Sequence, residues 1–174
     1  GRPVIAYRGG GALETIVAEL SKAGIGYEAI YRSGLEGSGT GERDLVVAVG
    51  GDGTFLEVSH YIRSPDLPVL GVNSDPNAST GFFTYATADN FATVMEAIEN
   101  GKAPIAVLNR LEIILNDKKL PEPVLNDVLV AHTNPAAMTR YTLVADGVAT
   151  EARSSGLLVC TAAGSTGWIY QERG

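Results

Sequence analysis

A continuous apolar run that enters a glycine-rich turn is the feature that most constrains how this chain folds. Residues 45–49 are all apolar, and the turn Gly50-Gly51-Asp52-Gly53-Thr54 follows them directly. An uninterrupted apolar run is typical of a strand that is buried on both faces of a parallel sheet. Phe55, Val58 and Ile62 come next at helical spacing. The pattern predicts a strand, a turn and a helix within an α/β domain.

The turn itself predicts a phosphate-binding site. Glycines let backbone N–H groups approach a phosphate, and the N-terminus of a helix attracts the anion. Asp52 is the only acidic residue in the turn, so beside a polyphosphate its role would be to hold a metal ion or a hydroxyl group. A tight turn without a ligand is the alternative. The turn matches neither a Walker A loop nor the Gly-x-Gly-x-x-Gly fingerprint.

The first hundred residues alternate between strand and helix patterns. Strands are predicted over residues 4–7, 27–31 and 68–72, and a mobile loop or shortened linker over 33–41. Two amphipathic helices are predicted from apolar residues at i, i+3, i+4 and i+7: Leu13, Ile16, Val17 and Leu20, ending near Gly24, and Phe91, Val94, Met95 and Ile98, capped by Asp89 or Asn90 and ending at Gly101. Arg8-Gly9-Gly10-Gly11 is either a second phosphate loop on the neighbouring strand or a plain turn.

From Ala103 onward the pattern changes to short strands separated by turns. Strands are predicted over residues 105–108, 111–115, 128–130, 141–144 and 157–159, with hairpin turns at 116–119 and 144–148. We therefore predict a Rossmann-like α/β domain with a parallel sheet over residues 1–103 and a β-rich domain over 104–174.

Polar motifs follow several of these strands. Asn73 ends one strand, at the edge where open α/β sheets bind ligands. Asn126-Asp127 places an amide and a carboxylate where they could read an adenine edge and ribose hydroxyls. Thr161 opens a Gly/Ser/Thr-rich turn that offers hydroxyls and open backbone to a nucleotide. Asx turns and plain loops are the alternatives at each place.

The composition limits which classes of ligand and which environments fit this protein. The net charge of −7 argues against a nucleic-acid surface, so an anionic ligand would depend on local donors and a bound cation. The apolar runs are far shorter than the ~20 residues of a membrane span. Cys160 is the single cysteine, which fits a reducing compartment. His60 and His132 have no partners at zinc-site spacing.

Taken in order, four motifs resemble those of the NAD kinase family across nearly the whole chain. They are Gly50-Gly51-Asp52-Gly53-Thr54, Gly71-Val72-Asn73 with Gly81-Phe82, Asn126-Asp127, and Gly156 through Gly164-Ser165-Thr166. The versions around Ser155 and Thr161 look most like the branch of plant NADH kinase and animal mitochondrial NAD kinases. The first motif alone is shared with diacylglycerol and sphingosine kinases and, more loosely, phosphofructokinases.

The resemblance implies that ATP, with Mg²⁺ or another divalent cation, phosphorylates the 2′-hydroxyl of the adenosine ribose of NAD or NADH. Asp52 would orient and deprotonate that hydroxyl near the metal. The other implied binding residues are Gly51, Gly53 and Thr54 for phosphates, Asn73 in the dinucleotide cleft, Asn126 and Asp127 for adenine and ribose, Thr161, Ser165 and Thr166 in the loop over the adenosine, and Ser155 toward the nicotinamide end.

The resemblance also carries expectations about the whole protein. Asp127 stands where Glu is more usual, Ser155 where many bacterial members have Asp, and Trp168 where they have Tyr. Family members continue with further strands, so a truncated, β-sandwich-like second domain is expected. A homodimer or homotetramer is expected, inside the cell, in the cytoplasm or in a mitochondrion or peroxisome.

Two other functions fit part of the pattern. A lipid kinase of the diacylglycerol or sphingosine type shares the glycine-rich turn, but it would need an acyl channel and a membrane-facing surface. The acidic charge and the Asn126-Asp127 pair argue against it. A dinucleotide-binding regulator without turnover is the second alternative. Assays with ATP, Mg²⁺ and either NAD or a lipid separate the three.

Overall fold

The structure, a computed structural model, describes residues 2–37 and 43–166. The chain divides into two compact units, Gly1–Val107 and Leu108–Gly174, whereas the sequence analysis placed the boundary between residues 103 and 104.

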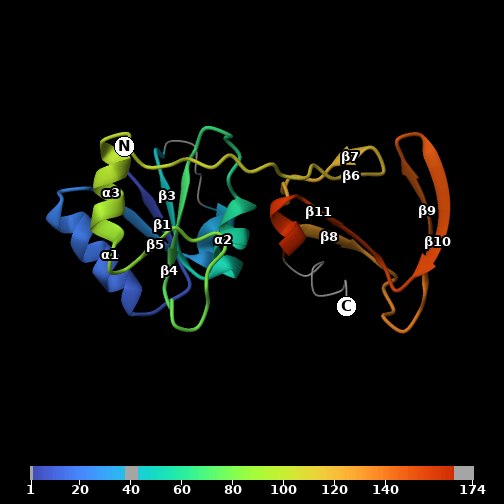
Figure 1. The fold of residues 1–174 in the computed structure, drawn as a ribbon, viewed down its shortest axis with the longest axis horizontal. Helices are drawn as coiled ribbons and strands as arrows, with labels where there is room; N and C mark the ends of the chain where they lie inside the picture. Colours follow the sequence, from blue (N-terminus) through green and yellow to red (C-terminus); the bar gives the residue numbers. More distant parts are fainter. Residues whose placement is uncertain (1, 38–42, 167–174) are drawn as a thin grey trace. The chain divides into compact units, whose positions relative to one another are not determined.

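The first unit is built on a five-stranded parallel sheet, as the sequence predicted (Figure 1). Its strands are β1 (Val4–Tyr7), β2 (Glu28–Tyr31), β3 (Val46–Gly50), β4 (Val69–Asn73) and β5 (Ala86–Thr87), in the order β2-β1-β3-β4-β5. This order belongs to the doubly wound sheets, in which the chain reverses direction between β1 and β3. Ligands in such sheets bind outside the carboxyl ends of the strands at that switch point.

Helices cover both faces of this sheet. Helices α1 (Gly11–Lys22) and α3 (Phe91–Glu99) lie on one face, and α2 (Asp52–Ser59) lies on the other (Figure 1). Alternate strand residues explain the arrangement, since side chains of a strand point to opposite faces. The main core contains the α1 and α3 stripes together with one set of strand residues, among them Ile5, Val47 and Val72. Helix α2 buries Phe55 and Val58.

Most of the predicted elements of this unit are confirmed, and one segment differs. Residues Arg32–Gly37 form a 3₁₀ helix, η1, and Leu35 within it is only 2% exposed. The sequence analysis predicted a mobile loop or a shortened linker over residues 33–41, and this prediction was wrong at Leu35, which is buried within the 3₁₀ helix. The rest of that prediction, residues 38–42, lies outside the described residues. Asn90 precedes α3, but its side-chain oxygen accepts from Thr87 N–H and does not cap the helix.

The second unit contains three antiparallel strand pairs. They are β6 (Ile114–Leu115) with β7 (Lys118–Lys119), β8 (Asp127–Val130) with β11 (Leu157–Cys160), and β9 (Thr139–Ala145) with β10 (Val148–Ser154); a 3₁₀ helix, η2 (Ala163–Thr166), follows β11. Both predicted hairpins are confirmed. Their turns use Asn116 and Asp117, and Asp146 and Gly147, all at positive φ, which is the conformation a two-residue hairpin turn requires.

The strand predicted over residues 105–108 does not form, and this prediction was wrong. Ile105 is 84% and Val107 89% exposed. A strand needs a neighbour to accept its backbone hydrogen bonds, and no strand of the described chain pairs with this segment. Ile105 and Val107 belong to the first unit, and apolar side chains of the second unit are exposed as well, including Val144 at 65% and Val148 at 66%. Among the described residues, no helix is both long and apolar enough to span a bilayer.

Candidate functional site

Two glycine-rich loops leave neighbouring strands at the switch point of the sheet. One is Gly50-Gly51-Asp52-Gly53-Thr54 after β3, and the other is Arg8-Gly9-Gly10-Gly11 after β1. The backbone N–H of Arg8 donates to Val49 O at 3.3 Å, which ties the two loops together where they begin. Gly9 and Gly10 have φ values of +132° and +102°, accessible mainly to glycine. The sheet therefore brings both predicted phosphate loops to the edge where ligands bind.

The first loop turns tightly because Gly50 packs directly against Thr54. A Cβ atom on Gly50 would lie 2.3 Å from Thr54 Oγ1. Thr54 is 2% exposed, and its hydroxyl has no hydrogen-bond partner among the residues that the structure describes. Helix α2 then begins at Asp52. The N–H of Thr54 donates to Gly51 O at 2.9 Å, so the N–H groups that precede this first bond of the helix are those of Asp52 and Gly53. The loop presents these donors to an anion.

We expect Gly50→Ala to destabilise the protein. Overpacking of this kind typically costs about 1–3 kcal/mol of unfolding free energy, and here the methyl would collide with the buried Thr54 side chain. Gly53→Ala is the matched control, because nothing lies within 4 Å of its added Cβ and alanine favours helix by roughly 0.5–1 kcal/mol. Urea unfolding curves measure both. Equal stabilities for the two variants would contradict the packing argument.

Asp52 does not stand free in the loop. Its two carboxylate oxygens accept the backbone N–H groups of Phe82 at 2.9 Å and Phe83 at 2.8 Å. The donors come from a turn thirty residues away, defined here as the 81–83 turn (Gly81, Phe82 and Phe83). Main-chain amides therefore fix the direction of the carboxylate. Asp52 was predicted from the sequence as a site residue. Gly81-Phe82 was named as part of a motif, but its hydrogen bonding to Asp52 was not predicted.

The 81–83 turn is itself held against the sheet. The ring of Phe83 stacks on that of Phe55 in α2, with centroids 5.3 Å apart and planes 4° apart. The Tyr85 N–H donates to Gly71 O at 3.0 Å. A Cβ on Gly71 would lie 2.4 Å from the Phe83 carbonyl oxygen, so the turn touches the β4 backbone. Phe82, in contrast, is 61% exposed.

Asn73 lies at the end of β4, but its side chain is turned inward. It is 4% exposed. Its amide nitrogen donates to Ser79 O at 2.9 Å, and its oxygen accepts the Asp75 N–H at 3.0 Å. Both polar atoms of the Asn73 side chain are thus hydrogen-bonded to the loop that follows β4. In this structure Asn73 holds that loop in place at the edge of the site.

The second unit brings together most of its predicted residues. Asp127, at the start of β8, faces Cys160 of β11 in register, and Asn126 Nδ2 donates to Asp127 Oδ2 at 2.8 Å. Thr161 Oγ1 donates to Leu125 O at 2.6 Å and accepts the Gly164 N–H at 3.0 Å. The loop after β11 is thereby held against the segment that carries the amide and the carboxylate.

The remaining predicted residues surround this loop or lie beside it. Ser165 Oγ donates to Ala162 O at 2.7 Å, and Thr166 ends η2. Ser155 is an exposed residue between β10 and β11, and its carbonyl oxygen accepts from Thr139 Oγ1. Trp168 lies outside the described residues. No three His, Cys, Asp or Glu side chains of the described segments are grouped for a metal ion.

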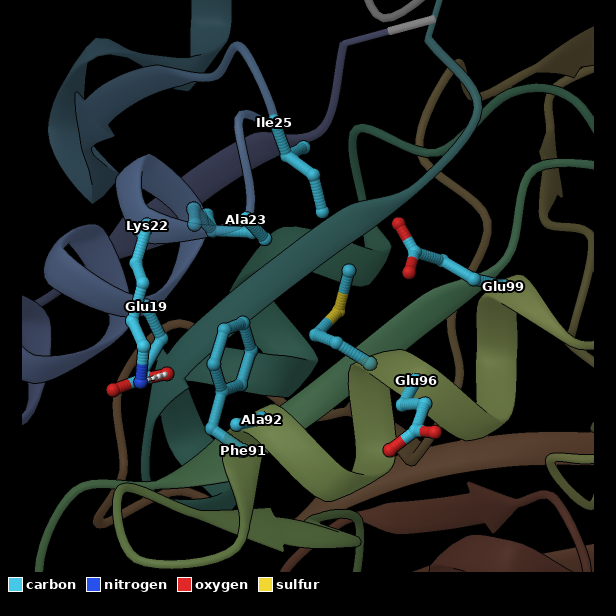
Figure 2. Close-up of a pocket in the computed structure, with 10 residues that line it drawn as sticks. Glu19, Lys22, Ala23, Ile25, Phe91, Ala92, Glu96 and Glu99 are labelled. Carbon is cyan, nitrogen blue, oxygen red and sulfur yellow. Dashed lines mark ion pairs between the residues drawn. The ribbon is translucent and has the colours of Figure 1, made fainter.

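A separate cavity of about 250 Å³ lies in the first unit between α1 and α3. Figure 2 shows its lining, to which α1 and the turn after it contribute Glu19, Lys22, Ala23 and Ile25, and α3 contributes Phe91, Ala92, Glu96 and Glu99. Glu19 and Lys22 form an ion pair at 3.7 Å on its rim. None of the predicted site residues lines this cavity, so it is distinct from the switch-point loops.

Comparison with known proteins identifies relatives of this architecture. Residues 19–103 match the family model described as the ATP-NAD kinase N-terminal domain. The chain is 41% identical over 152 residues to a probable NADH kinase of Oryza sativa subsp. japonica, covering 75% of this chain and 46% of the relative. It is 38% identical over 177 residues to an NADH kinase of Arabidopsis thaliana, covering 89% and 55%.

Archaeal relatives extend the comparison to a solved structure. An NAD kinase of Methanothermobacter thermautotrophicus is 31% identical over 134 residues, covering 76% of this chain and 46% of the relative. The crystal structure of an NAD kinase from Archaeoglobus fulgidus in complex with ATP superposes with a TM-score of 0.75 at 25% identity, covering 98% of this chain and 65% of that one. The chain spans about half the length of the sequence relatives.

Proposed function

The chain belongs to the NAD kinase family, and we propose that the protein it represents transfers the γ-phosphoryl group of ATP to the 2′-hydroxyl of the adenosine ribose of NAD or NADH. The observation that carries this proposal is the single carboxylate of Asp52, held by two main-chain amides at the start of α2. It lies at the switch point of the sheet, between loops suited to phosphate.

Phosphoryl transfer needs mainly positioning and charge neutralisation. In the proposed reaction, the ribose 2′-oxygen forms a bond to the γ-phosphorus while the bond from that phosphorus to the ADP oxygen breaks. Asp52 accepts the hydroxyl proton. The N–H groups of Gly51 and Gly53 would face the phosphates from the helix start, where the partial charge is positive. Thr54, whose own N–H donates to Gly51 O at 2.9 Å, would hold the loop in shape behind them.

A divalent cation fits the donor set of this site. Mg²⁺ is usually held by one or two carboxylates together with substrate phosphates, without a dedicated protein cage. Asp52 is the only carboxylate of the glycine-rich loop, and it would be the protein group beside the ion. The cation would neutralise charge on the transferred phosphoryl group.

The second unit supplies the proposed dinucleotide contacts. Asn126 would meet the adenine, Asp127 the ribose hydroxyls, and the loop from Thr161 to Ser165 and Thr166 would cover the adenosine. The hydrogen bonds that hold this loop to Leu125 and Asn126 support the assignment. Ser155 is proposed toward the nicotinamide end.

We propose that the guanidinium group of Arg8 binds the phosphates of ATP. Its side chain is exposed at the end of β1, next to the β3 loop, in a chain whose net charge of −7 would repel ATP. We expect Arg8→Ala to raise the KM for ATP roughly tenfold, the size of one charge-assisted hydrogen bond. Arg2→Ala is the control. Arg2 is also exposed, but it lies just before the N-terminal end of β1, whereas Arg8 follows the C-terminal end. An unchanged KM for ATP in Arg8→Ala would exclude this role.

The direct test uses the full-length protein. It is incubated with ATP, Mg²⁺ and NAD, NADH or a lipid acceptor, and the phosphorylated product is identified by mass spectrometry. NADP or NADPH is expected. Phospholipid would favour the lipid kinase, and dinucleotide binding without product would favour the regulator. The relatives named above support the dinucleotide kinase.

Further properties are proposed for the whole protein. The second unit would belong to a β-sandwich-like domain, which its antiparallel pairs and exposed apolar side chains support. The same exposed side chains support a homodimer or homotetramer. A location inside the cell, in the cytoplasm or an organelle, is supported by the single cysteine.

A further inference from the structure

We propose that the 81–83 turn is a positioning element for Asp52, which acts on the reaction only through that carboxylate. The inference rests on the proposed function and deepens it. Consecutive backbone N–H groups of Phe82 and Phe83 each donate to a different oxygen of Asp52, at 2.9 and 2.8 Å. Two bonds from one rigid segment fix both the position and the plane of the carboxylate.

The two amides leave Asp52 able to bind substrate. An ionised carboxylate has about four acceptor sites, so two remain after the amides are bound. A ribose hydroxyl can therefore donate to Asp52 without displacing the turn. The turn defines the direction from which that hydroxyl approaches, because the remaining lone pairs lie in the plane that the amides set.

The turn is rigid enough for this role. Gly81 has φ +70°, and a Cβ there would lie 2.0 Å from Thr84 Oγ1 and 3.0 Å from Asn73 Nδ2. Phe83 is stacked on Phe55 and its carbonyl approaches Gly71. Support thus comes from α2, from β4 and from the loop after β4. A displacement of about 1 Å at a reacting group can cost roughly 10²-fold in rate.

The experiment is a double-mutant cycle in the full-length enzyme with Gly81→Ala and Asp52→Asn. Gly81→Ala deforms the turn without changing the carboxylate. Its control is Gly24→Ala, because Gly24 also has φ +70° but nothing lies within 4 Å of its added Cβ. Both glycine variants carry the same backbone strain. Phe83→Leu, which keeps the N–H and loses the stacked ring, is the milder second variant if Gly81→Ala folds poorly.

We expect Gly81→Ala to lower kcat by about 10²-fold with the KM for ATP changed less than about twofold, and Gly24→Ala to retain kcat. In the Asp52→Asn background, Gly81→Ala should lower kcat by less than about threefold, because effects that pass through one group are not additive. Additive losses would overturn the inference while leaving the proposed function intact, since the wild-type enzyme would still form NADP.

Hydrogen exchange tests the contact without any turnover. The Phe82 and Phe83 amides should exchange at least about tenfold faster in Asp52→Ala than in the wild-type protein, since each loses its acceptor. Equal exchange rates would overturn the inference even if the protein has no kinase activity. Absence of NADP formation together with the expected exchange would count against the proposed function and leave the contact standing.

Discussion

Asp52→Asn is expected to leave the α/β unit folded and to lower turnover by about 10²–10³-fold, the usual effect of losing one preorganised electrostatic group. Asparagine keeps the shape of the side chain but has a single acceptor oxygen. Its NH₂ group would face the N–H of either Phe82 or Phe83. The variant also cannot take the proton of the ribose hydroxyl.

The control for this prediction is Asp89→Asn. Asp89 is an exposed aspartate of the same unit, just before α3, so its replacement makes the same change in charge. Circular dichroism and thermal unfolding check the folds, and the rate of NADP formation gives the turnover. Near-normal turnover in Asp52→Asn would refute the role assigned to this carboxylate, whatever the effect on stability.

Gly164→Ala is expected to raise the KM for the dinucleotide by roughly tenfold, equivalent to about 1.4 kcal/mol. A Cβ on Gly164 would lie 2.2 Å from the carbonyl oxygen of Asn126 and 2.7 Å from its carbonyl carbon. Backbone atoms cannot move aside as a side chain can, so the loop after β11 must shift. The shift would separate Thr161 from Leu125 and misplace the proposed adenosine contacts.

Ala162→Ser provides the comparison for Gly164→Ala. It enlarges an exposed side chain in the same loop by one atom, so the KM for the dinucleotide should stay within about twofold of wild type. Initial rates at varied NAD concentrations give kcat and the KM for the dinucleotide. An unchanged KM in Gly164→Ala would remove the loop from the dinucleotide site.

The sequence predicted the elements whose local pattern is strong. The apolar run at residues 45–49 forms most of the central strand β3 (Val46–Gly50), and the glycine-rich turn after it marks the start of α2. The hairpins at Asn116-Asp117 and Asp146-Gly147 form because these residue types tolerate positive φ. In each case the deciding interactions lie within a few residues of one another.

The features missed by the sequence depend on distant partners. Residues 105–108 have an apolar composition suited to a strand but find no pairing strand in the described chain. β5 has two residues and exists because it pairs with Val72 and Asn73. At Asn73, the hydrogen bond from the Asp75 N–H spans two residues and is the Asx turn given as the alternative there. The amide donors of Asp52, in contrast, come from a turn thirty and thirty-one residues along the chain. Local patterns carry no record of such contacts.

The contact between Asp52 and residues 82 and 83 is made by the main chain of those residues. Every amino acid except proline supplies the same N–H group. The exposed ring of Phe82 can therefore be exchanged for many other side chains during evolution while the aspartate beside it keeps its geometry. The orientation of the carboxylate would thus be independent of which side chain residue 82 carries.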